Sequence, residues 1–274
     1  MTTITPRIDA ELPAASLPDV QGSADRRRIA IDKVGVKEVR YPISILTRDG
    51  QTQSTVARVN MYVSLPAERK GTHMSRFIEV LHEYGNSIDS QRVIEICRLL
   101  RKKLDANDAH MEMEFTYFVR KLAPVSLQPG MMDYSVRFRC DVNGEPDFVM
   151  GVTVPATSLC PCSKEISAYG AHNQRCEISA EVRFDGMLWI EDLVSILESA
   201  ASTQVYSLLK RPDEKFVTED AYNNPKFVED IIRDLAIRLN SDDRITWYRI
   251  QSENFESIHS HNAFAQITCD KRNG

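Results

Sequence analysis

The segment CEISAEVRF, residues 176–184, has the clearest strand pattern in the chain. Apolar and polar side chains alternate along it without a break. A period of two residues indicates a β-strand with one face against a core and the other toward solvent. Such one-sided strands are typical of antiparallel sheets. The apolar face carries Cys176, Ile178, Ala180, Val182 and Phe184, and the polar face carries Glu177, Ser179, Glu181 and Arg183.

Segments on both sides of this strand repeat the alternation, and amphipathic helical patterns separate them. Apolar residues spaced three to four apart predict helices over 74–84, 90–104 and 190–209. Another helix is expected to start with Asn224 as its N-cap and Pro225 as its first residue. The other predicted strands cover residues 39–45, 59–65, 111–117, 134–140, 147–155, 244–251 and 262–269.

The order of these elements reads ββααββ and then ββααββ again, although no internal sequence repeat accompanies it. We therefore expect an α+β protein made of two such units, with antiparallel sheets and helices on one face. Residues 1–28 are rich in Pro, Ala, Ser and Asp and are expected to form a disordered arm. The first unit is expected to span 29–143 and the second 144–274.

The composition argues against several classes of protein. The net charge of -5 disfavours a broad nucleic-acid-binding face, which needs a basic excess. No apolar run approaches the roughly 20 residues that span a bilayer, and the N-terminus has no apolar signal-peptide core. Six cysteines in 274 residues do not form a disulfide framework. These features predict a cytoplasmic protein without membrane or nucleic-acid partners.

The loop before the 176–184 strand carries candidate chemistry in the sequence SLCPCSKEISAYGAHNQRCE, residues 158–177. We expect a structureless loop of about 17 residues here, and loops of that length are often functional. Cys160 and His172 are plausible ligands of a borderline divalent ion. With a third ligand and a water molecule, they would form an open catalytic site. Spacing alone leaves that third ligand open among Asp213, Glu214, Glu219 and Asp220.

The same residues allow other interpretations. Cys160 and His172 could form a nucleophile pair without a metal. Cys162 could be a second ligand or a redox partner of Cys160. The cysteines could also be an incidental pair in a turn, with His172 an ordinary hydrogen-bonded histidine.

Three motifs closely resemble the type IB GTP cyclohydrolases I. They are VPATSLCPCSKEISAYGAHNQR at 154–175, GTHMSRF at 71–77 and SENFESIHSHNAFAQ at 252–266, and the similarity covers nearly everything after residue 30. The resemblance implies the tunnelling fold, whose unit is ββααββ, and a homotetramer with active sites at subunit interfaces. It also implies an enzyme that hydrolyses cyclic amidines. Its reaction converts GTP to 7,8-dihydroneopterin triphosphate and formate, the entry to folate-type pterins.

The resemblance also implies roles for individual residues. Cys160, His172 and Glu214 match the family's metal ligands, and Cys160 is also implied to be important in catalysis. The ion would be zinc, manganese or ferrous iron, with no organic cofactor. Glu229 matches the glutamate that anchors guanine, where a carboxylate can accept hydrogen bonds from N1–H and the 2-amino group. Without the resemblance, Glu229 would be interpreted as an acidic residue that favours a helix start.

Other candidates are less specific. His259 and His261 are candidate general acids or bases, and a surface role is the alternative for both. His73 and Arg76 open a predicted helix, so they are expected to contact the triphosphate or a neighbouring subunit. Further phosphate candidates are Lys164, Arg175, Lys210 and Arg211.

Two rival functions remain from the sequence. One is a related tunnelling-fold nitrile reductase of queuosine synthesis, with Cys160 as nucleophile and NADPH as reductant. The other is a non-catalytic nucleotide-binding or redox-sensing protein in which Cys160 and Cys162 oxidise.

Overall fold

The computed structural model describes residues 18–272, so most of the arm predicted over 1–28 lies outside the described residues. The strands are β1 Ile31–Leu46, β2 Thr52–Leu65, β3 Ala109–Leu122, β4 Pro129–Asn143, β5 Glu145–Leu159, β6 Asn173–Phe184, β7 Thr203–Gln204, β8 Ile245–Asn254 and β9 Ala263–Asp270. The helices are α1 Met74–Tyr84, α2 Ser90–Lys103, α3 Pro161–Ile166, α4 Ile190–Glu198, α5 Arg211–Asn223 and α6 Val228–Ser241.

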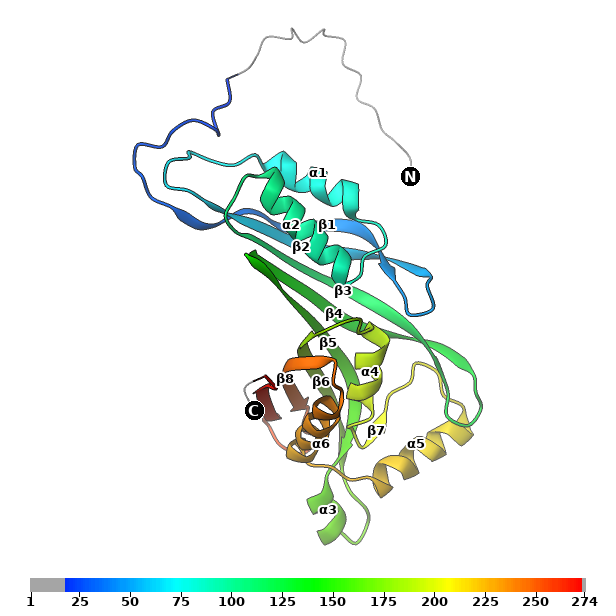
Figure 1. The fold of residues 1–274 in the computed structure, drawn as a ribbon. Coiled ribbons are helices and arrows are strands. Elements are labelled where there is room, and N and C mark those ends of the chain that lie inside the picture. The colour runs from blue at the N-terminus through cyan, green and yellow to red at the C-terminus, as the bar shows by residue number, and fades with distance from the viewer. Residues whose placement is uncertain (1–17, 273–274) are drawn as a thin grey trace.

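All the strands belong to one antiparallel sheet. Its order is β1-β2-β3-β4-β5-β6-β8-β9, and the short β7 pairs with β5. The predicted boundary at 143/144 falls in the tight turn between β4 and β5, where Asn143 pairs with Glu145. Gly144 lies between them with a φ of +82°, a backbone conformation that glycine adopts without a steric penalty. The two halves of the chain therefore share one continuous sheet (Figure 1).

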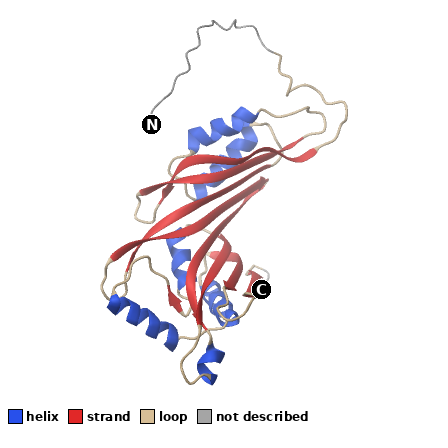
Figure 2. Cartoon of the chain, turned by 180° about the vertical axis from the view of Figure 1, so that it is seen from behind, coloured by secondary structure: helices blue, strands red, loops and turns tan. Residues whose placement is uncertain are grey.

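Helices cover one face of this sheet. Helix α2 packs on β3 and β4, α4 packs on β5 and β6, and α6 packs on β8 and β9. Tyr117 of β3 is buried with the core residues and donates its hydroxyl hydrogen to Glu191 of α4 at 2.6 Å. The buried apolar side chains form one cluster that runs through both halves. Figure 2 shows the long curved strands, with α1 and α2 at one end and the remaining helices at the other.

The second half has more elements than the sequence pattern indicated. The helix predicted over 190–209 was wrong in length, because α4 ends at Glu198 and β7 follows. Helix α5 was not predicted, and its low apolar content explains why. Apart from Asp213 and Ala221, none of its residues is buried.

The predicted start of the last helix was also wrong. Asn224 is the C-cap of α5, and its backbone N–H donates to the carbonyl of Asp220 at 3.0 Å. Its side-chain amide donates to the carbonyls of Ala201 and Ser202, so it is not free to cap the next helix. Helix α6 begins at Val228 and buries one apolar face: Val228, Ile231, Ile232, Leu235 and Leu239.

The loop expected between the strands predicted at 147–155 and 176–184 is shorter and more regular than predicted. Strand β5 continues to Leu159, β6 begins at Asn173, and α3 occupies Pro161–Ile166 between them. Pro161 at the first helical position suits a helix start, because proline lacks the N–H that would stay unpaired there.

The chain is already attached to the fold before residue 28, where the arm was predicted to end. The backbone N–H of Asp25 donates to Glu68 at 2.9 Å, and that of Gly71 donates to Gln21 at 3.1 Å. No helix within residues 18–272 is long and apolar enough to cross a membrane.

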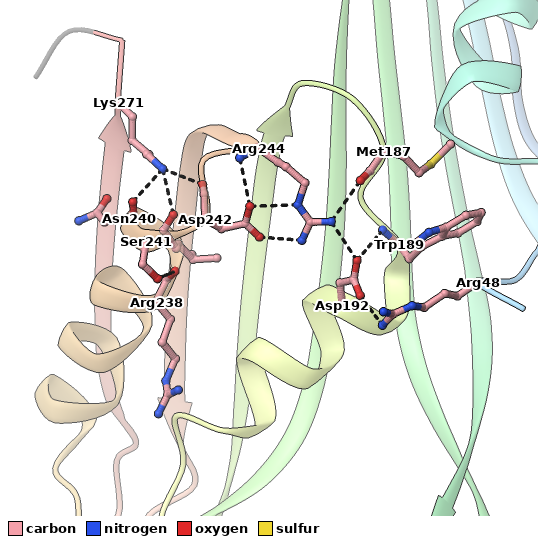
Figure 3. Close-up of polar contacts among 11 residues, drawn as sticks. Arg48, Met187, Trp189, Asp192, Arg238, Asn240, Ser241, Asp242, Arg244 and Lys271 are labelled. Atoms are coloured by element: carbon pink, nitrogen blue, oxygen red, sulfur yellow. Dashed lines mark hydrogen bonds and ion pairs between the residues drawn. The ribbon is translucent and has the colours of Figure 1, made fainter.

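A polar network joins the two halves at the turn between β1 and β2. Figure 3 shows Asp192 of α4 between Arg48 of this turn and Arg244, which precedes β8. Asp192 accepts hydrogen bonds from Arg48 at 2.8 Å and from Arg244 at 3.2 Å. Arg244 also binds Asp242 at 2.7 Å. The turn of the first half is thereby tied to the first turn of α4.

Candidate functional site

Cys160 lies where β5 ends and α3 begins. It is the N-cap of α3, and its Sγ accepts a hydrogen bond from the backbone N–H of Ser163 at 3.4 Å. Its side chain is partly exposed, whereas Cys97, Cys140 and Cys176 are buried. Cys160 is therefore held in place by the backbone and remains accessible, unlike the cysteines of the core.

His172 lies beside Cys160 although twelve positions separate them in sequence. The backbone N–H of Cys160 donates to the carbonyl of His172 at 3.1 Å. Ser163 bridges the same residues, because its hydroxyl donates to Cys160 O at 3.2 Å and accepts from His172 N at 3.2 Å. Nδ1 of His172 contacts Gln174 and Ser257, each at 3.1 Å. Nε2 has no hydrogen-bond partner within the described part of the chain, so it can bind a ligand.

The segment before α6 runs alongside this corner. The backbone N–H of Lys226 donates to the carbonyl of Leu159 at 3.0 Å, and Ser158 donates its hydroxyl hydrogen to Lys226 O at 3.0 Å. Glu229 follows three residues later in the first turn of α6, with an exposed side chain. The helix start does not use Glu229 as its cap, because Asp230 accepts the hydrogen bond from Phe227 N at 3.0 Å. The Glu229 carboxylate therefore remains available for a ligand.

The segment after β8 brings a third group of residues to the corner. Phe255 N donates to Arg175 O at 2.9 Å and so extends the pairing of β8 with β6. Ser257 then reaches His172. His259 and His261 are exposed, and their rings stack with centroids 5.3 Å apart. Both histidines thus lie within a few residues of a contact to His172.

Three of the four carboxylates left open as a third ligand differ clearly in the structure. Asp213 is fully buried and accepts hydrogen bonds from Val125 N, Ser126 N, Ser126 Oγ and Lys210 N at 2.6–2.8 Å. Burial alone raises the pKa of this carboxyl, but the four hydrogen bonds outweigh it and hold the pKa well below its usual range. Asp213 therefore holds α5 to the turn between β3 and β4 and has no free oxygen for a metal.

Glu214 is exposed on the same helix, and its carboxylate has no hydrogen bond or ion pair among the described residues. Glu219 lies 3.8 Å from Lys215 in an ion pair. Helix α5 contacts α3 near the C-terminus of α5, where Lys164 Nζ of α3 donates to Tyr222 O at 2.5 Å. Glu214 is eight residues from Tyr222, which is about 12 Å along a helix. No three His, Cys, Asp or Glu residues within 18–272 are grouped so that they could hold a metal ion.

The donor chemistry at the corner nevertheless fits a borderline divalent ion. A cysteine sulfur and an unpartnered imidazole nitrogen are the donors that zinc and ferrous iron accept. Cys160 and His172 are adjacent through their backbones, and both side chains are partly exposed. These two residues could hold such an ion together with a carboxylate from elsewhere.

Four of the phosphate candidates fall into two groups. Arg175 is exposed on β6 and lies close to the corner, whereas Lys164 is already bound to Tyr222 and lies 4.3 Å from its ring centroid. His73 contacts Asp19 at 3.3 Å, and Arg76 donates to Lys103 O at 3.4 Å. Figure 1 shows α1 and α3 at opposite ends of the molecule, so a single chain does not bring His73 and Arg76 to Cys160.

Gln174, Glu256 and Ser257 were not predicted as site residues. Gln174 had a detectable signal, because it occupies the apolar face of the β6 alternation, in phase with Cys176, and is only 7% exposed. A polar side chain on that face needs a partner. Glu256 and Ser257 gave no periodic signal, since they follow the end of β8.

Solved structures with a similar fold are uricases of very low sequence identity. The uricase from Arthrobacter globiformis matches with a TM-score of 0.51 at 11% identity, over 89% of this chain and 94% of that one. The uricase from Bacillus fastidious matches with a TM-score of 0.52 at 10% identity, over 89% and 95% of the two chains. At this identity the likeness concerns the fold alone.

Sequence relatives are much closer. A GTP cyclohydrolase FolE2 from Nitrosococcus oceani is 52% identical over 263 residues, which cover 95% of this chain and 98% of the relative. One from Geobacter sulfurreducens is 54% identical over 256 residues, which cover 93% and 99%. The family model described as type I GTP cyclohydrolase folE2 matches residues 17–265. The chain therefore belongs to the FolE2 family of type I GTP cyclohydrolases.

Proposed function

We propose that this GTP cyclohydrolase acts in the cytoplasm and converts GTP to 7,8-dihydroneopterin triphosphate and formate, the first step of folate biosynthesis. The reaction would make it a hydrolase of cyclic amidines that depends on a divalent metal ion. One observation carries the proposal. The end of β5 collects Cys160, His172 and the segment that leads to Glu229, although these lie far apart in sequence.

Glu229 is proposed to bind the guanine. Its carboxylate can accept hydrogen bonds from N1–H and from the 2-amino group, a pair of donors that adenine does not present. The exposed position of Glu229 in the first turn of α6, beside a separate capping residue, supports this role.

Cys160, His172 and Glu214 are proposed as ligands of zinc, manganese or ferrous iron. Such an ion, when bound, lowers the pKa of water and supplies a nucleophile near neutral pH. Water then attacks C8 of the guanine and opens the imidazole ring, and a second hydration releases formate. The ribose rearranges and closes on the pyrimidine with loss of one water molecule. His259 and His261 are proposed to transfer protons in these steps.

The chain is proposed to have the tunnelling fold, with ββααββ units at 29–143 and 144–274, and to form a homotetramer with active sites between subunits. The free carboxylate of Glu214 and the remote position of α1 support this assembly. A second subunit would bring Glu214 to the metal and His73 and Arg76 to the triphosphate, alongside Arg175 and Lys164.

The test is GTP turnover by chelator-stripped protein to which Mn(II), Fe(II) or Zn(II) is restored. We expect metal-dependent formate release and a fluorescent pterin after oxidation, in equal amounts. Folded protein that gives no pterin with any metal would contradict the proposal. NADPH-dependent nitrile reduction would then be assayed on the same preparation.

A further inference from the structure

The strand pairing of β6 with β8 places an acidic residue behind His172. The pairing ends at Cys176 and Asn254, and the hydrogen bond from Phe255 N to Arg175 O extends it. Glu256 therefore lies beside Gln174, and Gln174 Nε2 donates to Glu256 Oε1 at 3.5 Å. The other side of the Gln174 amide faces His172.

The chemistry of the side chains fixes which group donates and which accepts along the row of hydrogen bonds from Glu256 through Gln174 to His172. A carboxylate only accepts hydrogen bonds, so Gln174 must present its NH₂ group to Glu256. The amide oxygen of Gln174 then faces Nδ1 of His172 at 3.1 Å and can only accept. In the neutral imidazole, Nδ1 is therefore the nitrogen that carries the proton, and Nε2 is the nitrogen without one.

Glu256 is not placed there for stability alone. Its second oxygen, Oε2, is buried and has no hydrogen-bond partner within the described residues. Burying an unpaired polar atom of this kind costs free energy. Gln174 is likewise a buried polar residue at an apolar position of β6. Packing alone would favour neither a buried unpaired carboxylate oxygen at Glu256 nor a buried amide at Gln174.

We propose that Glu256 and Gln174 are positioning residues that fix the tautomer of His172 and aim Nε2 outward. The inference rests on the proposed function in one respect, namely that Nε2 is the atom that binds the metal. Partners of this kind orient metal-binding histidines and typically change metal affinity by about 10–100-fold when they are removed.

The first test needs neither GTP nor metal. Nitrogen NMR of histidine-labelled, chelator-stripped protein distinguishes a protonated from an unprotonated ring nitrogen, with His172→Gln providing the assignment. We expect protonated Nδ1 and unprotonated Nε2 in the wild type. Glu256→Gln keeps the shape but can donate or accept, so Gln174 is no longer forced into one orientation. We expect a mixture of His172 tautomers in that variant.

Glu253→Gln is the matched control, because Glu253 lies on β8 and accepts its hydrogen bond from Asn262 at 2.8 Å, whereas Glu256 accepts from Gln174. It should leave the tautomer unchanged. Ser257→Ala removes the other hydrogen-bond partner of Nδ1 and so tests its contribution separately. An unprotonated Nδ1 in the wild type would overturn the inference. So would a tautomer that changes in Ser257→Ala but not in Glu256→Gln.

The second readout is Mn(II) and Zn(II) affinity, measured by competition with a chromophoric chelator. We expect binding about 10–100-fold weaker in Glu256→Gln and in Gln174→Leu, and unchanged in Glu253→Gln. Unchanged affinity in both site variants would contradict the positioning role. Because tautomer and affinity are measured without substrate, this failure is distinguishable from an absence of GTP turnover.

Discussion

The two halves of the sheet have similar layouts but differ in what they add to them. In the first half, α1 and α2 follow β2 and precede β3 in the sequence. They bury Phe77, Leu81 and Val93 against the strands. The second half places α4 and α6 in the same way but adds α3, β7 and α5. Cys160, His172 and Glu229 all lie at or beside these additions. The shared layout supplies a rigid core, and the added segments supply the accessible polar groups.

The largest expected difference between the halves concerns their cysteines. Cys160→Ala should lower GTP turnover by more than about 100-fold, since even residues that only orient a metal ligand contribute about 10–100-fold. Cys97 is fully buried on α2, and its Sγ lies 3.4 Å from the carbonyls of Ala109 and Cys140. Cys97→Ala should keep turnover per folded molecule and lose about 1–2 kcal/mol of unfolding free energy. Pterin formation and denaturant melts of both variants make the measurement.

A neighbouring pair of acids in α6 gives the next largest effect. Glu229→Gln should lower kcat/KM for GTP by about 100-fold or more, because hydrogen bonds to a charged acceptor contribute about 1.5–3 kcal/mol each. Asp230→Ala removes the side chain that accepts the hydrogen bond from Phe227 N and should cost about 1 kcal/mol of stability. It should leave kcat/KM nearly unchanged. Equal kinetic losses in both variants would show that Glu229 acts through the helix start and not through guanine.

Asp213 and Glu214 provide a similar contrast on α5. Glu214→Gln should weaken metal binding without lowering the melting temperature, because its side chain is exposed. Asp213→Asn should lower the melting temperature by several degrees, because Asp213 holds α5 to the turn between β3 and β4. Chelator competition and thermal melts of the two variants test this, and a reversed pattern would contradict the assignment.

The Asp213 effect should depend on pH. Its folded-state pKa lies below the ordinary value of 3.8, so its stabilisation is fully present above that pH. The stabilisation is lost as the pH falls from that value through the lower folded-state pKa. The gap in melting temperature between wild type and Asp213→Asn should therefore be constant from pH 5 to 8 and shrink below about pH 4. A gap that grows on acidification would rule out this cause.

The sequence predicted the elements shared by the two halves better than the segments that the second half adds. Periodicity located α1, α2 and the long strands, because their apolar faces are continuous. It failed at α5, which buries little, and at Asn224, whose amide binds carbonyls of residues 201–202 that are remote in sequence. The motif at 154–175 suggested Cys160 and His172 as candidates. It gave no role to Glu256, because only the pairing of β6 with β8 brings that residue beside Gln174.

The smallest expected effect is at the network that joins the halves. The side chain of Arg48 is 65% exposed, although its partner Asp192 is mostly buried. Exposed ion pairs contribute about 0–1 kcal/mol, so Arg48→Ala should cost at most about 1 kcal/mol. Turnover should stay at the wild-type level. A denaturant melt with a much larger loss would mean that the halves depend on this contact more than their shared sheet suggests.

The claim that the chemistry resides where β5 meets α3 is tested most directly by loading chelator-stripped protein with Co(II) and recording its absorption spectrum. A cobalt ion bound by a thiolate gives an intense near-ultraviolet charge-transfer band. We expect this band in the wild type and in Cys97→Ala, and we expect its loss in Cys160→Ser. A band that persists in Cys160→Ser, or a wild type that binds cobalt without the band, would show that Cys160 is not a metal ligand.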